Sequence, residues 1–247
     1  MPGGIYVALS GLRHHAEQLD QIASDIANTS TSGYKGERST SVASERPSFS
    51  SALQAAVDVT PGEKQIDFRP GSINGTGRDL DFALDGRGFF VVETPEGLQY
   101  TRNGHFQVMN DGTLTTVDGY AVQGEIGTDE DEYGPLVLPG GAVSAEADGT
   151  ILVDGLPSGK FRIADFAAYD ALSRKENGRF SAPAGLTPDI GTTVELRGGA
   201  LEQSNVTMAE QLVQVSEVAR TFEALQRGLS VLMNDIDGRA ITELGRR

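Results

Sequence analysis

The chain has 247 residues, of which 38% are hydrophobic, and this is enough for one large or two modest compact domains. Its 35 acidic and 20 basic residues give a formal net charge of -15, which disfavours nucleic acid and anionic membrane surfaces as partners. Cysteine is absent, and its absence excludes disulfides, thiolate metal sites and cysteine nucleophiles.

The N-terminal segment predicts a long helix with one apolar face. Its apolar residues recur at spacings that alternate between four and three, which is a heptad stripe. The stripe residues are Ile5, Leu9, Leu12, Ala16, Leu19, Ala23 and Ile26. The segment lacks the basic and apolar regions of a secretory signal peptide, so we expect no cleaved leader. No apolar run approaches the roughly 20 residues needed to cross a bilayer, so we expect no membrane insertion.

The segment from Thr29 to Ser72 is rich in Ser, Thr, Gly and Pro and predicts an extended connector. Beyond it, short apolar or alternating runs are separated by turn dipeptides such as Asp85-Gly86 and Asn103-Gly104, which are hairpin signals. In Asp79–Asp85 the apolar side chains alternate with aspartates, as expected for a strand with one buried face. The middle of the chain therefore predicts an antiparallel β-sandwich or open barrel.

A second heptad stripe lies near the C-terminus and begins after Thr207-Met208-Ala209-Glu210, a capping box. Its spacing slips once, between Phe222 and Leu229. The stripe residues are Leu212, Val215, Ala219, Phe222, Leu225, Leu229 and Leu232. We interpret both stripes as an assembly interface shared with neighbouring subunits. The alternative is that each stripe covers one face of the chain's own β-domain.

These elements predict an α+β fold in which long N- and C-terminal helices pack side by side as a coiled coil, with a central antiparallel β-sandwich or barrel-like domain between them in the sequence. The expected division is 1–35 for the N-terminal helix and a following turn, 36–72 for the connector, 73–200 for the β-rich domain and 201–247 for the C-terminal helix.

No catalytic, cofactor-binding or metal site is predicted. His14 and His15 are adjacent, whereas two metal ligands on one helix face need a spacing of three or four. Gly155–Lys160 is one residue too short for a phosphate-binding loop. Asp129–Glu132 lacks the ligand spacing of a calcium loop and is better explained as a solvated hairpin tip. We therefore expect no enzymatic activity and no small-molecule substrate.

Several segments, in order along the chain, resemble the flagellar rod and hook proteins of the bacterial axial structure. The most specific is the turn that follows the first helix, which contains Asn28, Gly33, Tyr34 and Lys35. The segments that carry the resemblance are Ile5–Leu12, Ile22–Lys35, Asp81–Val92, Tyr100–Phe106, Asn110–Leu114 and Leu201–Val206.

The resemblance implies a structural subunit of the flagellar basal-body rod, exported by the flagellar type III apparatus without a cleaved signal and assembled in the periplasmic space. Its expected partners are copies of itself and other rod and hook proteins. Length favours the proximal-rod type, with the distal-rod type as the nearest alternative. The competing hypothesis is a secreted, β-rich binding or adhesin-like module with helical termini, which would retain ligand binding after loss of the C-terminal helix.

Overall fold

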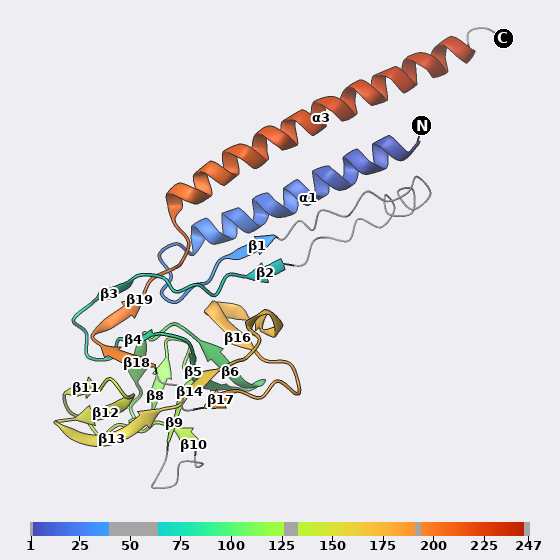
Figure 1. Cartoon of the computed structure of the whole chain (residues 1–247). Helices are drawn as coiled ribbons and strands as arrows, with labels where there is room; N and C mark the ends of the chain where they lie inside the picture. Colours follow the sequence, from blue (N-terminus) through green and yellow to red (C-terminus); the bar gives the residue numbers. More distant parts are fainter. Residues whose placement is uncertain (1, 40–63, 126–132, 191–193, 245–247) are drawn as a thin grey trace. The chain divides into compact units, whose positions relative to one another are not determined.

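The computed structural model describes the backbone of residues 2–39, 64–125, 133–190 and 194–244, and the side chains of 9–38, 65–125, 133–190 and 194–231. The chain forms two compact units (Figure 1). Unit 1 comprises Met1–Ala27, Glu37–Gln65 and Thr207–Arg247, and unit 2 comprises Asn28–Gly36 and Ile66–Val206. The acidic segment Asp129–Glu132 and the side chains of Ile5 and Leu232 lie outside the described residues.

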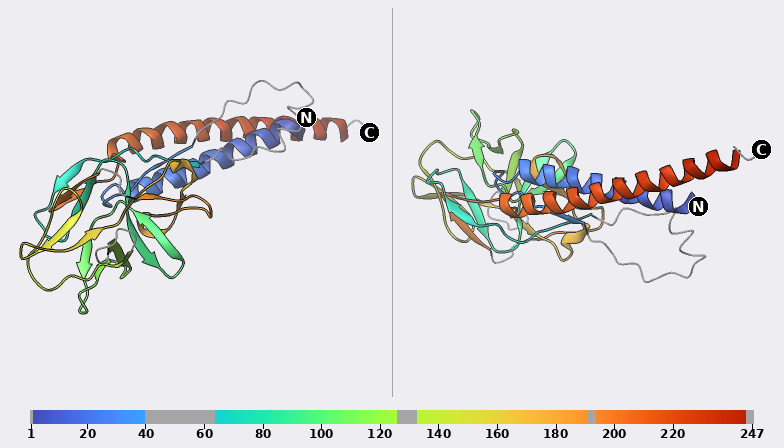
Figure 2. Two further views of the ribbon diagram at one scale, coloured as in Figure 1. Left: turned by 60° about the horizontal axis from the view of Figure 1, so that its bottom comes forward. Right: turned by 90° about the horizontal axis from the view of Figure 1, so that it is seen from above.

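Unit 1 contains two α-helices, α1 (Pro2–Ala27) and α3 (Met208–Leu244). It also contains a two-stranded sheet of β1 (Glu37–Ser39) and β2 (Lys64–Ile66), except that the last residue of β2, Ile66, is assigned to unit 2. The helices lie side by side and run in opposite directions, as the two views of Figure 2 show. The predicted capping box opens α3, because the Glu210 amide donates to Thr207 Oγ1 at 3.4 Å and the Thr207 hydroxyl donates to Glu210 Oε2 at 2.8 Å.

The predicted coiled coil of terminal helices is wrong. A coiled coil buries the residues of its heptad seam against the facing helix. Here none of the seam residues with described side chains is buried, and Leu9 and Leu212 are each 55% exposed. The buried helical side chains are instead Ile22, Asp25 and Gln211. Heptad spacing therefore gives each helix an apolar stripe without closing a dry seam between them.

Unit 2 is built from short antiparallel strands, most of them in one large sheet of 13 strands. The sheet runs in the order β11-β12-β13-β9-β5-β6-β16-β15, with β7, β8, β10, β14 and β17 attached to it. Two smaller sheets pair β18 with β4 and β19 with β3.

The strand bounds are β3 Ile73–Gly75, β4 Phe82–Asp85, β5 Phe89–Thr94, β6 Gly97–Thr101, β7 Phe106–Val108, β8 Leu114–Thr116, β9 Ala121–Glu125, β10 Tyr133–Pro135, β11 Val143–Ala145, β12 Thr150–Val153, β13 Leu156–Phe161, β14 Ile163–Asp165, β15 Ser173–Arg174, β16 Arg179–Ser181, β17 Asp189–Ile190, β18 Glu195–Gly198 and β19 Ala200–Glu202. Two short 3₁₀ turns span Tyr169–Ala171 and Glu176–Gly178.

Two groups of buried apolar side chains hold these strands together. One gathers around Phe82, Phe90, Phe106 and Phe161, whose rings meet at centroid distances between 5.0 and 6.2 Å. The other includes Phe89, Val91, Tyr100, Phe166 and Phe180. Successive residues of β5 belong to different groups, because successive side chains of a strand point to opposite faces. Both faces of β5 are therefore buried.

The mixed α+β class holds, but the predicted β-sandwich or barrel is replaced by a large multi-stranded antiparallel sheet with small satellite sheets. The reason is that strands far apart in sequence pair with one another. Glu202 of β19 lies opposite Ile73 of β3, and Leu196 of β18 lies opposite Leu84 of β4. Local turn signals cannot predict such pairings.

Candidate functional site

The turn that follows α1 is held by its own short hydrogen bonds. The Thr31 amide donates to the Asn28 carbonyl at 3.1 Å, and the Thr31 hydroxyl donates to Asn28 Oδ1 at 3.1 Å. The Tyr34 amide then donates back to the Thr31 carbonyl at 3.3 Å. These bonds reverse the chain within a few residues and direct Tyr34 and Lys35 into the interior, where both are buried.

Gly33 lets this turn approach another backbone closely. Its φ is +68°, in the left-handed region that favours glycine. A Cβ atom at this position would lie 2.4 Å from both the Arg102 carbonyl carbon and the Asn103 nitrogen. The Gly33 amide also donates to the Glu202 carbonyl at 2.8 Å. Only glycine therefore fits between the hairpin at Arg102-Asn103 and β19.

Three charged side chains meet beneath the turn and form what we call the ionic junction: Lys35, Arg102 and Glu202. Lys35 Nζ donates to Glu202 Oε1 at 2.5 Å, and Arg102 Nη1 donates to Glu202 Oε2 at 3.3 Å. The Lys35 and Glu202 side chains are each 1% exposed and that of Arg102 is 5% exposed. One buried carboxylate is therefore shared by two buried cations.

Backbone groups complete the coordination of the ionic junction. Lys35 Nζ also donates to the Arg69 carbonyl at 2.9 Å, and the Gly71 amide donates to Glu202 Oε1 at 2.9 Å. Arg102 Nη2 donates to the Gly86 carbonyl at 2.7 Å. Burial is the largest influence on the pKa of Lys35 and lowers it from the ordinary 10.5, even though the adjacent Glu202 carboxylate acts in the opposite direction.

The ends of the segments that leave unit 2 are tied together beside the ionic junction. The Gly36 amide donates to Asn205 Oδ1 at 2.8 Å, and the Asp67 amide donates to the Gly36 carbonyl at 2.8 Å. Asn205 Nδ2 donates to the Asp67 carbonyl at 2.6 Å, and the Asn205 amide donates to the Tyr34 carbonyl at 3.2 Å. Asn205 therefore bridges the first residue of the predicted connector, Gly36, and the part near its end that contains Asp67.

The predicted assembly residues lie on α1 and α3 in unit 1, separate from the ionic junction of unit 2. On α1, Leu12, Leu19 and Ile26 are half-buried, whereas Leu9, Ala16 and Ala23 are exposed. On α3, Leu212 is exposed. The remaining α3 stripe residues with described side chains are half-buried: Val215, Ala219, Phe222, Leu225 and Leu229.

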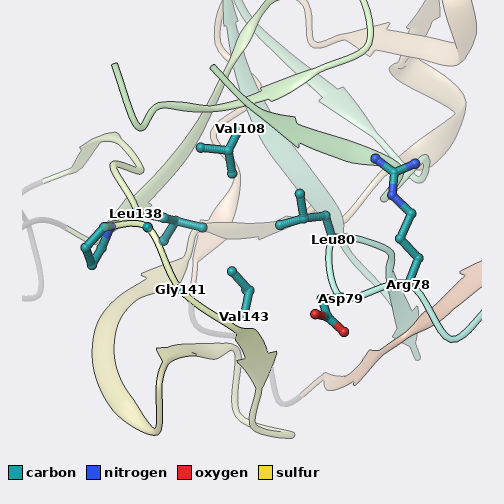
Figure 3. A pocket seen from close by; sticks show the side chains of 9 residues that line it. Arg78, Asp79, Leu80, Val108, Leu138, Gly141 and Val143 are labelled. Carbon is teal, nitrogen blue, oxygen red and sulfur yellow. The ribbon is translucent and has the colours of Figure 1, made fainter. Parts of the chain in front are cut away.

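An apolar pocket of about 380 Å³ lies in unit 2 (Figure 3). Leu80, Val108, Leu138 and Val143 line it, and Arg78 lies at its side. Arg78 is already engaged, because its Nη2 donates to the Phe106 carbonyl at 3.1 Å. The pocket therefore offers apolar surface and few free polar groups.

No helix within the described residues is both long and apolar enough to cross a membrane.

Comparisons with known proteins match both the sheet and the C-terminal helix. The model of the flagellar hook protein FlgE/F/G D1 domain matches residues 83–153, and the model of the flagellar basal body rod FlgEFG protein C-terminal region matches residues 197–235. The flagellar basal-body rod protein FlgG of Bacillus subtilis (strain 168) is 32% identical over 89% of this chain and 91% of its own length. The flagellar basal-body rod proteins FlgF of Rhizobium meliloti (strain 1021) and Salmonella typhimurium (strain LT2) are each 31% identical, over 99% and 97% of both chains.

The chain therefore belongs to the FlgE/F/G family of flagellar hook and basal-body rod proteins. It is a structural subunit of the rod, and its place is the basal body of the bacterial flagellum. The predicted rod function is confirmed, and the adhesin-like alternative gains no support. FlgF and FlgG relatives match at nearly the same identity, so the preference for the proximal-rod type stays a prediction.

The resemblance singled out Asn28, Gly33, Tyr34 and Lys35. The structure places Lys35 in the ionic junction, Gly33 against the backbone of Arg102 and Glu202, and Asn28 and Tyr34 in the turn itself. The roles of Glu202 and Arg102 were missed, although both lie in segments similar to the family. The one available signal was an acidic residue that directly follows the apolar pair Ala200-Leu201, since a carboxylate buried with such residues needs a buried partner.

Proposed function

We propose that the apolar stripes of α1 and α3 form the assembly interface through which this rod subunit binds copies of itself and other rod and hook proteins. The observation that carries the proposal is that the stripe residues with described side chains are all left unburied in the single chain. Exposed leucines such as Leu9 and Leu212 lie at stripe positions on both helices. Rod subunits act in an assembly, so a neighbouring subunit is the natural partner for these faces.

Burial energetics favour this interpretation. Complete burial of a leucine or phenylalanine side chain contributes about 1.5–3 kcal/mol relative to full exposure. The half-buried Leu19 and Phe222 have realised only part of this stabilisation in the single chain. A neighbouring subunit that covers the stripes would supply the remaining burial free energy at each stripe position.

We further propose that the subunit acts by assembly without catalysis, and that it reaches the periplasmic space by flagellar type III export. The structural role of the family supports the first of these proposals. The division of the chain at residues 35, 72 and 200 also stays a prediction. Within unit 2, the proposed role of the ionic junction is to fix the turn at Asn28–Gly36 against β19.

The stripe proposal is tested by placing a charge in each stripe. Leu19→Asp and Phe222→Asp should abolish motility and incorporation into the rod, because an unpaired carboxylate in an apolar interface costs several kcal/mol. The matched control is Thr221→Asp, which adds the same charge at an exposed position next to Phe222. Near-ultraviolet circular dichroism should report an intact unit 2 in all three variants.

Motility retained by both stripe variants would place Leu19 and Phe222 outside the assembly interface. Equal loss of motility in the Thr221→Asp control would show that added charge on α3, and not its position in the stripe, is responsible.

A further inference from the structure

A second pocket in unit 2, of about 520 Å³, combines apolar walls with arginines and is not explained by the assembly stripes. Phe68, Ile73 and Tyr169 contribute apolar surface to it, and Arg87, Arg102 and Arg197 contribute charge. We call it the arginine pocket. Asp85 is the one acidic residue among its lining residues. Each arginine is paired with a carboxylate: Arg197 with Asp85, Arg87 with Asp165 and Arg102 with Glu202. Because Lys35 also pairs with Glu202, the cluster keeps one net positive charge on a chain whose net charge is -15.

The two outer arginines are held in different ways, and only Arg197 depends on an exposed ion pair alone. Arg197 Nη2 lies 2.5 Å from Asp85 Oδ2, and these side chains are 54% and 45% exposed. Arg87 Nε lies 3.3 Å from Asp165 Oδ2, and these side chains are 64% and 14% exposed. Arg87 Nη2 also donates to the Phe166 carbonyl at 3.0 Å, and the guanidinium lies 4.8 Å from the centre of the Tyr169 ring. Exposed ion pairs contribute little to stability, so the Arg197 guanidinium can exchange Asp85 for an incoming carboxylate at small cost, whereas Arg87 stays fixed beside it.

The third arginine is a fixed, buried source of positive charge. Arg102 is oriented by its bonds to Glu202 and the Gly86 carbonyl. Its Nε is buried and has no hydrogen-bond partner among the described residues. Since Lys35 shares the same carboxylate of Glu202, the ionic junction carries one net positive charge next to this pocket. Charge in a buried setting is screened by salt much less than surface charge.

We propose that the arginine pocket binds a carboxylate side chain carried on an apolar segment of a neighbouring axial subunit. The guanidinium of Arg197 would receive the carboxylate, since arginine presents a planar fork of donors that matches it, and the fixed Arg87 would add positive charge beside it. Phe68, Ile73 and Tyr169 would contact the apolar residues on either side. The inference rests on the proposed function, because it takes the source of the segment to be a partner in the assembly.

The test uses two peptides and the full-length protein. Acetyl-Phe-Glu-Phe-amide should bind and shift the amide resonances of Gly71 and Gly86, which border the pocket, in an NMR titration. Acetyl-Phe-Gln-Phe-amide has the same shape without the charge and should bind at least roughly fivefold more weakly, the ratio expected for loss of a solvent-accessible ion pair. Equal affinity for the two peptides would overturn the proposal.

Variants then locate the site. Arg87→Gln and Arg197→Gln should each weaken binding of the glutamate peptide by roughly fivefold, whereas Arg227→Gln, an exposed and ion-paired arginine of α3, should leave it unchanged. Equal losses in all three variants would mean that only net charge matters and would refute the pocket. Inorganic phosphate that competes as strongly as the peptide would reduce the site to a simple anion site and would also refute the apolar recognition.

The peptide assay is independent of the assembly stripes. If Leu19→Asp is lost from the rod but the peptide still binds, the stripe interface and the arginine pocket are each supported by their own result. Absence of peptide binding with normal behaviour of the stripe variants would reject the pocket alone.

Discussion

Replacement of Glu202 by alanine should destabilise unit 2 much more than replacement of Lys35 by methionine. Glu202 is the only carboxylate in the ionic junction, so Glu202→Ala leaves Lys35 and Arg102 buried together without a counter-charge. Lys35→Met removes one cation and leaves Glu202 paired with Arg102 and bonded to the Gly71 amide. The two substitutions therefore have opposite effects on the balance of buried charge.

The expected magnitudes follow from the burial of this cluster. Removal of one partner from a buried ion pair costs about 3–5 kcal/mol, so Glu202→Ala should lower the free energy of unfolding by that amount. For a protein of this size each kcal/mol lowers Tm by about 2–4 °C, which gives a fall of roughly 6–20 °C. Lys35→Met should cost less than about 2 kcal/mol, because the remaining charges balance.

Thermal and urea unfolding followed by near-ultraviolet circular dichroism would measure these differences. Glu195→Ala is the matched control, since Glu195 lies on neighbouring β18 and is exposed, and it should change stability by no more than about 0.5 kcal/mol. The double variant of Lys35 and Glu202 should lose less stability than the sum of the two single variants, because it removes the cation that Glu202→Ala strands. The charge-balance reasoning is refuted if Glu202→Ala costs no more than the Glu195 control.

Three other outcomes are expected. Gly33→Ala and Gly77→Ala both place alanine at a left-handed φ, at a cost of about 1–2 kcal/mol. Only the added Cβ of the Gly33 variant meets backbone atoms, so the unfolding free energy of this variant should fall by about 1–3 kcal/mol more than that of the Gly77 variant. Equal losses would contradict the close approach at Gly33. Burial lowers the pKa of Lys35 in the folded chain below its ordinary 10.5, so between the folded and unfolded pKa values the unfolded chain binds more protons and stability rises with pH. Wild type should therefore gain stability relative to Lys35→Met as the pH is raised from neutral to 10.5. A difference that stays constant with pH would exclude this linkage. Thr207→Ala removes the capping hydroxyl of α3 and should destabilise the helix by about 1 kcal/mol in far-ultraviolet circular dichroism melts. Thr221→Ala, within the same helix, should leave the helix stability unchanged, and similar losses in the two variants would argue against the cap.

Features set by neighbouring residues were predictable from the sequence. The capping box at Thr207 marks the start of α3, because the bond partners lie three residues apart. The turn Asp85-Gly86 ends β4, which lies within the predicted strand segment Asp79–Asp85. In each instance the physical cause acts within a few residues, so the pattern and the structure coincide.

Features that depend on distant pairing were not predictable in this way. Lys35 and Glu202 are 167 positions apart, and nothing in either local pattern says that the two side chains meet. The heptad spacing of Leu9 and Leu212 predicts a stripe, but spacing alone does not state what covers the stripe. This is why the coiled coil was predicted in error while the helices themselves are present.

The bridging role of Asn205 has a mechanical consequence for a structural subunit of the flagellar rod. Tension on the chain at Gly36 or Val206 enters unit 2 through the same set of bonds, since Asn205 joins Gly36, Tyr34 and Asp67. A pull on any of these segments therefore loads several bonds at once and does not peel a single strand from the sheet. The nearby ionic junction is buried, so this anchor should keep its strength in salt concentrations that weaken surface ion pairs.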